Sequence, residues 1–320
     1  MMKRRMTKNS VMLICLLILG VMAIAQVKSE VAISENTTNI PLTTMLRAEV
    51  EAALKKRDFK QAETLLVNEI NQQKNSVEAA KLLIFTAGIF FLDSDWMNAA
   101  ICYKKAEKIA PLDARSRFTL AMAYLKLNQA SWAIPELQKL AQEQPENALY
   151  VYWLGRIDYD AQKYDQAVIK LRRAVELDPK MMRAHDNLGL TYEHLSDNEA
   201  AIKSYRTAIE LNRQQTNSSP WPNLNLAILL IGKNELNEAE ILLREAQRYD
   251  AKLPQIHYNL GQILEKQNKP IEAKEALLQA IVLDQNYAEP HYTLSRIYQK
   301  QGEKIKAKEE LELFQKLKKR

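Results

Sequence analysis

One short pattern returns along this 320-residue chain at an interval of 34 residues. Its clearest member is an alanine found at the same place in every period: Ala62, Ala99, Ala133, Ala167, Ala201, Ala239, Ala273 and Ala307. The interval widens at residues 77–79 and 216–219, where two short insertions shift the register. A fixed period of this length predicts an array of units that bury their apolar faces against one another. The eight units are 43–76, 80–113, 114–147, 148–181, 182–215, 220–253, 254–287 and 288–320.

Each unit contains two apolar segments at helical spacing, joined by a short polar turn. Glycine occurs only seven times and strong helix formers are abundant, so the composition favours an all-α protein. The recurring alanine is the twentieth residue of its unit, counted from Thr43 in the first. A larger side chain there would separate two helices whose axes lie roughly 8–10 Å apart. The pattern therefore predicts an antiparallel helical hairpin in every unit.

Taken together, the recurring residues resemble the tetratricopeptide repeat family. The segments Lys163 to Ala167 and Val175 to Pro179 are especially close to the family pattern, and the resemblance covers residues 43–320. It implies a right-handed α-solenoid of about eight helix-turn-helix repeats with one concave and one convex wall. It also implies that the first helix of each repeat lines the concave groove through repeat positions 2, 5, 6, 9 and 12.

The groove positions implied by this resemblance carry many aromatic, arginine and amide side chains, which are frequent anchors of protein interfaces. The candidate partner-binding residues are Tyr152, Arg156, Tyr159, Arg183, Asp186, Asn187, Trp221, Asn225, Tyr258, Asn259, Gln262, Tyr292 and Arg296. Three of them recur at position 6 (Asn187, Asn225 and Asn259), and the resemblance implies a partial asparagine ladder for an extended peptide. The alternative is that these residues are ordinary family choices without a binding role.

The last unit carries apolar residues on a helix that no later unit follows in this sequence. Leu311, Phe314 and Leu317 are the candidate contact residues, with Lys316 to Arg320 beside them. Terminal repeats need a polar outer face to stay soluble. We therefore expect this end to contact a partner or a second copy; a frayed, partly exposed helix is the alternative.

One repeat departs from the pattern at its eleventh position. Asp158 stands where the later units have an aromatic residue or leucine. A buried carboxylate without a partner is costly. Either the helix rotates to bury Ile157 or Tyr159 instead, or Asp158 is paired.

The sequence offers no catalytic or cofactor-binding motif. Nucleotide-binding glycine patterns, metalloprotease and paired-cysteine motifs, and the GxSxG elbow are all missing. Three histidines, His185, His257 and His291, share the fourth repeat position, but equivalent residues of adjacent repeats lie roughly 10 Å apart. Ligands of one ion lie within about 2 Å of it. We therefore expect that the protein is not an enzyme and that it has no cofactor and no metal site. Cys102 is expected to be a buried apolar residue.

The formal charge of +6 comes from the two ends of the chain. Residues 26–315 hold 37 basic and 39 acidic residues, so the body lacks the basic stripe that nucleic-acid binding requires. Residues 1–25 combine a basic start with an apolar run and small residues before Gln26, which predicts a signal peptide cleaved after Ala25. An uncleaved inner-membrane anchor at residues 11–27 is the alternative, and residues 26–42 are expected to form a flexible leader.

These features predict a non-catalytic scaffold or assembly adaptor that binds a peptide or partner protein in the bacterial periplasm or cell envelope. A membrane-associated complex is a possible setting, and the oligomeric state is open. The alternative is a regulatory or substrate-recruiting subunit of a separate enzyme, such as a glycosyltransferase, a polysaccharide-export system or a cytochrome-maturation complex. A purely structural spacer is a third interpretation.

Overall fold

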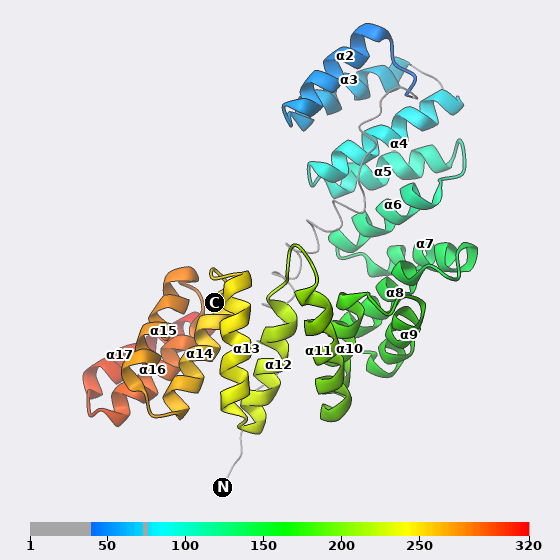
Figure 1. The fold of residues 1–320 in the computed structure, drawn as a ribbon. Helices are drawn as coiled ribbons and strands as arrows, with labels where there is room; N and C mark the ends of the chain where they lie inside the picture. The colour runs from blue at the N-terminus through cyan, green and yellow to red at the C-terminus, as the bar shows by residue number, and fades with distance from the viewer. Residues whose placement is uncertain (1–39, 73–75, 320) are drawn as a thin grey trace. The chain divides into compact units, whose positions relative to one another are not determined.

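The computed structural model describes residues 40–72 and 76–319 (Figure 1), and within them it contains helices and no strands. The predicted signal peptide, and residues 26–39 of the predicted leader, lie outside the described residues. The sixteen helices are α2 (Thr44–Lys55), α3 (Phe59–Gln72), α4 (Val77–Leu92), α5 (Trp96–Glu107), α6 (Ala114–Lys126), α7 (Ala130–Glu143), α8 (Ala148–Asp160), α9 (Tyr164–Leu177), α10 (Met182–His194), α11 (Asn198–Arg213), α12 (Trp221–Lys233), α13 (Leu236–Tyr249), α14 (Pro254–Lys266), α15 (Pro270–Leu283), α16 (Ala288–Lys300) and α17 (Lys304–Lys318). None of these helices has the length and apolar character that a bilayer span requires.

Consecutive helices form eight helix-turn-helix repeats, so the predicted all-α solenoid class is confirmed. Each turn contains one residue with a left-handed backbone, and it is always the fifteenth residue of the repeat: Arg57, Ser94, Asn128, Gln162, Ser196, Asn234, Asn268 and Gly302. That conformation ends a helix by turning the chain back on itself. Since Arg57 shares it, the first repeat has the same register as the others.

The recurring alanine is buried in every repeat, with at most 4 % of its surface exposed. It lies where the two helices of a hairpin touch. The small eighth residue has the same cause: a Cβ atom added at Gly189 would lie 2.4 Å from the ring of Tyr205 on the partner helix. Small residues therefore let the two helices of each hairpin pack closely, as the sequence pattern predicted.

The two insertions differ in structure. Residues 77–79 form no separate loop, because Ser76 caps α4 by accepting a hydrogen bond from the Ala79 amide at 3.1 Å, and they become its first turn. Residues 216–219 do lie outside the helices. The fully buried Asn212 holds them: its side chain donates to the Ser219 carbonyl and accepts from the Ser219 amide, both at 2.7 Å.

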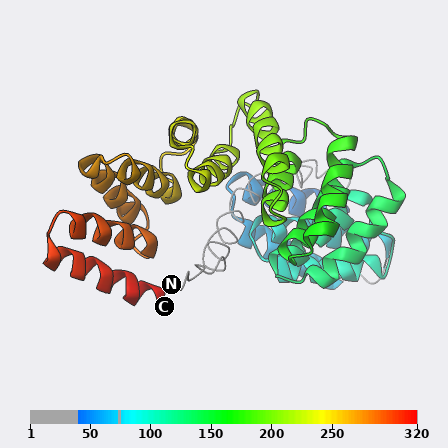
Figure 2. The same ribbon diagram turned by 90° about the horizontal axis from the view of Figure 1, so that it is seen from below.

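The helices divide into two compact units at Tyr150, inside α8. Unit 1 contains α2 to α7 and the first residues of α8. Its core includes Val50, Leu66 and Leu82 from three successive helices. Unit 2 contains the rest of α8 and α9 to α17, and Figure 2 shows its helices following one another in chain order toward α17. All of the candidate binding residues belong to unit 2.

Candidate functional site

Side chains that the sequence singled out join α8 to α10, α10 to α12 and α14 to α16. We call these residues, at positions 2, 5, 6, 9 and 12 of α8, α10, α12, α14 and α16, the first-helix face. Between α8 and α10, Asn187 is the central member: it accepts a hydrogen bond from Arg156 at 2.8 Å and donates to the hydroxyl of Tyr152 at 3.3 Å. The guanidinium of Arg183 lies 5.0 Å from the centre of the Tyr152 ring. Four predicted residues therefore form one connected cluster.

Arg156 is also paired along its own helix. Its guanidinium lies 2.9 Å from a carboxylate oxygen of Asp160. Burial by itself disfavours the charged guanidinium, but the combined effect of Asp160, Tyr152 and Tyr159 outweighs it and raises the pKa of Arg156. Asp160 is a member of the site that the sequence analysis missed; its spacing of four residues from Arg156 on one helix was the available signal.

Asp186 provides the link between α10 and α12. Its carboxylate accepts a hydrogen bond from the side chain of Asn225 at 3.0 Å, and it is only 7 % exposed. Burial raises the pKa of Asp186 from 3.8 to about 6, while the bond from Asn225 and the charge of Arg156 act in the opposite direction. Desolvation dominates because one amide donor replaces the several water molecules that a free carboxylate would bind.

The predicted asparagine ladder is only partly available to a ligand. Asn187 and Asn225 use their side-chain amides to join neighbouring helices. Asn187 also donates to the Arg183 carbonyl of its own helix at 2.8 Å, as Asn259 does to the Gln255 carbonyl at 2.7 Å. These amides are also largely buried, with 5 % of Asn187 and 6 % of Asn259 exposed. The buried asparagine amides stabilise the packing of successive helices, and the residues around them form the accessible surface of the face.

Further along the face, a separate group of contacts involves α14 and α16. Tyr258 accepts a hydrogen bond from Gln262 at 2.7 Å and packs edge-on against Tyr287, and burial raises its pKa to about 12. The largely buried Glu265 of α14 accepts from both Arg296 at 3.1 Å and Lys300 at 2.7 Å. Trp221 is 6 % exposed and belongs to the core, so it presents little surface to a partner.

Tyr159 and Tyr292 occupy the two ends of the face. The hydroxyl of Tyr159 lies 3.2 Å from a ring nitrogen of His194, and the His194 ring stacks on Tyr164. Tyr292 is 41 % exposed and contacts Phe314 of its own hairpin. At the same end, Leu311 is exposed, whereas Phe314 and Leu317 are half-buried.

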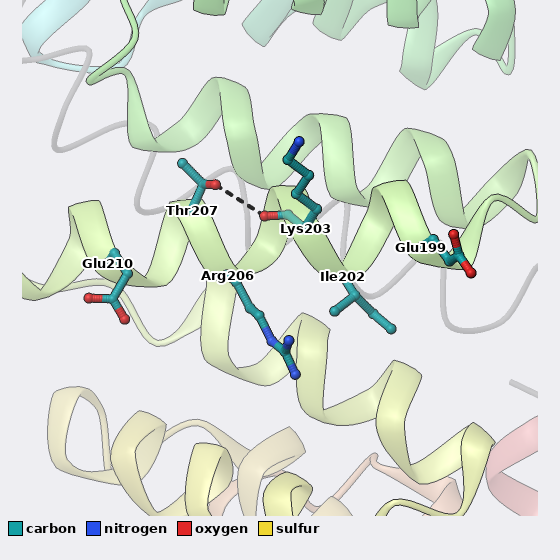
Figure 3. A pocket seen from close by; sticks show the side chains of 6 residues that line it. All are labelled: Glu199, Ile202, Lys203, Arg206, Thr207 and Glu210. Carbon is teal, nitrogen blue, oxygen red and sulfur yellow. Dashed lines mark hydrogen bonds between the residues drawn. The ribbon is translucent and has the colours of Figure 1, made fainter.

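The surface of α11 carries a shallow depression lined by Glu199, Ile202, Lys203, Arg206, Thr207 and Glu210. Figure 3 shows Lys203 and Arg206 extending in different directions, and Thr207 donating to the Lys203 carbonyl at 3.1 Å. Arg206 pairs with Glu238 of α13. Because acidic and basic groups alternate and do not converge on one point, this depression resembles a solvated helix surface.

The histidines at the fourth repeat position have separate partners. A ring nitrogen of His185 lies 3.0 Å from the Pro179 carbonyl, one of His257 lies 2.8 Å from the Ala251 carbonyl, and one of His291 lies 2.6 Å from Glu310. Within residues 40–72 and 76–319, no three His, Cys, Asp or Glu side chains are grouped to hold a metal ion. Burial raises the pKa of Cys102 to about 11, so its thiol stays protonated near neutral pH.

Family models match this chain in unit 2. A TPR repeat model matches residues 155–196, one tetratricopeptide repeat model matches 183–215 and 288–320, and another matches 254–287. The chain is a tetratricopeptide repeat protein. The family assignment agrees with the left-handed fifteenth residue and the buried alanine, which occur in all eight repeats.

Curated relatives of this tetratricopeptide repeat protein are much longer. It is 26 % identical over 169 residues to BBSome complex member BBS4 of Bos taurus, covering 53 % of this chain and 25 % of the relative. It is 32 % identical over 126 residues to Superkiller complex protein 3 of Mus musculus, covering 39 % of this chain and 8 % of the relative. The chain thus spans a quarter or less of these relatives.

Solved structures share the fold at low sequence identity. A tetratricopeptide repeat protein from Parabacteroides merdae has a TM-score of 0.62 and 16 % identity, covering 79 % of this chain and 97 % of the other. Pseudomonas aeruginosa pilF has a TM-score of 0.57 and 21 % identity, covering 67 % and 95 %. Yeast Tom70 has a TM-score of 0.57 and 18 % identity, covering 99 % of this chain and 72 % of Tom70.

The unusual Asp158 of the fourth repeat is paired. It is 8 % exposed, and its carboxylate forms an ion pair with Lys170 on the second helix of the same hairpin. Ile157 and Asp158 are both buried, so the helix keeps its register and Lys170 supplies the opposite charge. Of the two explanations that the sequence left open, pairing is the one found.

Asp186 gives this tetratricopeptide repeat protein a testable pH dependence. Because its folded pKa of about 6 lies above the usual value of 3.8, the fold favours the protonated acid. The stability that protonated Asp186 contributes is fully present below about pH 4 and is lost as the pH rises through 6. We expect Asp186→Asn, which stays neutral, to be more stable than the wild type at pH 7.5 by about 3 kcal/mol, with the difference vanishing near pH 4. Urea denaturation followed by circular dichroism at both pH values measures this.

Glu245→Gln is the control with the opposite sign. Arg213 donates to Glu245 through two nitrogens at 2.8 and 2.7 Å, which lowers the pKa of Glu245 to about 2 despite its burial. The stability that ionised Glu245 contributes to the fold is present above about pH 4.5 and is lost as the pH falls through 2. Glu245→Gln should therefore be less stable than the wild type at pH 7.5. A stability difference for Asp186→Asn that is the same at pH 4 and 7.5 would rule out desolvation of this carboxylate.

Proposed function

We propose that this chain is a non-catalytic interaction scaffold that binds a protein or peptide partner on the first-helix face of unit 2. The observation that carries the proposal is the row of side chains from Tyr152 on α8 to Arg296 on α16, within which contacts join α8 to α10, α10 to α12 and α14 to α16. Hydrogen bonds and ring contacts hold the row in place before any ligand arrives. Less conformational freedom is then lost on binding, which favours affinity.

The half-buried members of the row give it the chemistry of a protein interface. Arg183 stacks on an aromatic ring, Tyr258 and Gln262 form a hydrogen-bonded pair, and each is partly accessible to solvent. Aromatic rings and guanidinium groups are the usual anchors of protein contacts. Acidic, basic and amide groups alternate along the row, which suits a polar peptide or protein surface and offers no continuous positive stripe for nucleic acid.

The relatives support a role within an assembly. One is named as a BBSome complex member and another as a Superkiller complex protein. The protonated thiol of Cys102 and the separate partners of the three histidines favour a scaffold over an enzyme.

We also propose that the scaffold acts in the bacterial cell envelope after export. This rests on the sequence of residues 1–25, with Lys3, Arg4 and Arg5 before an apolar run that ends at Ala25. Export would place the lone Cys102 in an oxidising compartment, where its burial protects it.

Affinity purification after crosslinking in intact bacteria tests both proposals. The wild type is compared with Arg183→Ala plus Gln262→Ala, two half-buried positions on the first-helix face. We expect the double variant to lose at least ten-fold of its crosslinked partner while keeping its melting temperature. In the same preparation, a chain that begins at Gln26 supports export and cleavage; a chain that begins at residue 1 contradicts cleavage and favours the uncleaved anchor.

The matched control is Ile169→Ala plus Ile241→Ala, on the second helices α9 and α13. These residues are 70 % and 68 % exposed, so their removal leaves the core intact. If the control loses the partner and the first-helix variant keeps it, the binding face has been misassigned. If the wild type crosslinks to no protein at all, the spacer interpretation replaces the scaffold.

A further inference from the structure

The last hairpin exposes a residue that the other hairpins bury. The twenty-fourth residue of each repeat packs between its own hairpin and the next. It is at most 3 % exposed in six repeats whose next hairpin lies in the same unit: Leu66, Tyr103, Leu171, Tyr205, Leu243 and Leu277. Leu311, the equivalent residue of α17, is 36 % exposed. The surface around Leu311 is therefore of the interior kind, and no residue among 40–72 and 76–319 covers it.

Two aromatic residues extend this uncovered surface. Tyr292 on α16 stands at the same repeat position as Tyr152, which is 5 % exposed and bonded to Asn187 of the next first helix. Tyr292 is 41 % exposed. Beside it, Phe314 occupies a position where Ala280 of the preceding repeat is fully buried. We call Tyr292, Leu311 and Phe314 the tail face.

The first helix, α2, has the complementary property. Met45, at the third repeat position, is 76 % exposed, whereas the equivalent residues Leu82, Ala184 and Ile256 are completely buried. Ala52, at the tenth position, is exposed, and its equivalents are buried in other repeats: Ile89, Ala123, Thr191, Ile263 and Ile297. Ala48 lies between them on the same side of α2 and is also exposed. Met45, Ala48 and Ala52 form the head face.

We propose that the tail face of one copy packs on the head face of a second copy, so that the repeat array continues from chain to chain. The two faces are the two halves of the contact that joins successive hairpins inside each unit. Large side chains on the tail face oppose the small Ala48 and Ala52, which allows close packing of helices. Tyr292 belongs to both this surface and the first-helix face, and the substitutions that test the inference lie outside the first-helix face.

Charge favours this head-to-tail pairing over a tail-to-tail dimer. Helix α17 has five lysines and three glutamates, so two copies of it face to face would bring like charges together. Helix α2 has two acidic and two basic residues, and Arg47 is turned toward the carbonyls of Ile40 and Leu42. The exposed Glu49 is therefore available to the lysines of α17. A head-to-tail contact is heterologous and does not close on itself, so it leads to open chains of copies.

Sedimentation velocity of the full chain from about 5 to 200 μM tests the proposal with two substitutions. Leu311→Arg blocks the tail face and Ala52→Arg blocks the head face. We expect the wild type to form species larger than a dimer, and each variant alone to remain monomeric to at least ten-fold higher concentration. An equimolar mixture should form a dimer and nothing larger, because it retains one intact tail and one intact head. Ile305→Arg, at a site on α17 that is 77 % exposed and away from the tail face, should assemble as the wild type does.

Each other result overturns the proposal. A wild type that is monomeric throughout shows that the faces do not associate. A dimer that survives Ala52→Arg and is lost with Leu311→Arg indicates tail-to-tail pairing instead. Assembly that persists in both variants arises elsewhere, for example from the apolar residues 11–25. Circular dichroism and melting curves of every variant confirm that the arginines have not unfolded the terminal hairpins.

Discussion

Gly189→Ala is expected to lower the free energy of unfolding by about 2–4 kcal/mol, although it adds a single methyl group. The added Cβ would lie 2.4 Å from two ring carbons of Tyr205. Tyr205 has no exposed surface, and its hydroxyl donates to Glu193 at 3.1 Å, so its ring has little room to move. Either the ring leaves its place or α10 and α11 separate. Urea denaturation followed by helical circular dichroism measures the loss.

Gly232→Ala is the matched control for this substitution. Gly232 also lies in a first helix, α12, but a Cβ atom there would meet nothing within 4 Å. Alanine is the better helix former, so this variant should gain up to about 1 kcal/mol. If the two variants shift stability in the same direction and by similar amounts, the close contact between Gly189 and Tyr205 does not exist in solution.

Arg117→Ala is expected to cost about 3–5 kcal/mol, the second large effect. Arg117 on α6 is 3 % exposed, and its guanidinium lies 2.9 Å from Glu107 and 2.5 Å from Glu136. Without it, the 9 % exposed Glu136 would face Glu107 with no buried cation between them. Differential scanning calorimetry should show the change in the transition of unit 1, which contains all three residues.

Two further variants separate this effect from a general loss of charge. Arg206→Ala breaks a pair with Glu238 in which both side chains are more than 40 % exposed, so it should cost under about 1 kcal/mol. Adding Glu136→Gln to Arg117→Ala should restore part of the lost stability, because the buried carboxylate is then gone. The ion cluster would be unimportant if Arg117→Ala cost no more than Arg206→Ala.

The pairing of polar residues was the least predictable part of the candidate site. The sequence identified Asn187, Asn225 and Asn259 as one class because they share a repeat position. In the structure, Asn187 and Asn225 join neighbouring helices, while Asn187 and Asn259 each donate to a carbonyl of their own helix. The difference depends on which side chains the next repeat presents. Such contacts lie more than 30 residues away, so local periodicity carries no information about them.

The turn residue with a left-handed backbone could also be predicted only in part from the sequence. Asparagine or glycine at the fifteenth position is a recognisable turn signal in four repeats, namely at Asn128, Asn234, Asn268 and Gly302. Arg57, Ser94, Gln162 and Ser196 adopt the same conformation without that signal. There the hairpin contacts made by the flanking helices impose a backbone that these residues do not favour by themselves.

By itself, the sequence determined the number of repeats, the all-helical class and the close contacts at alanine and glycine, because these follow from a fixed period and from side-chain size. Residues 1–25 also predict export, from local composition. The tertiary structure decided which predicted groove residues are committed to one another, that Lys170 neutralises Asp158, and that Leu311 and Met45 lie uncovered. These depend on distances between helices that only packing sets.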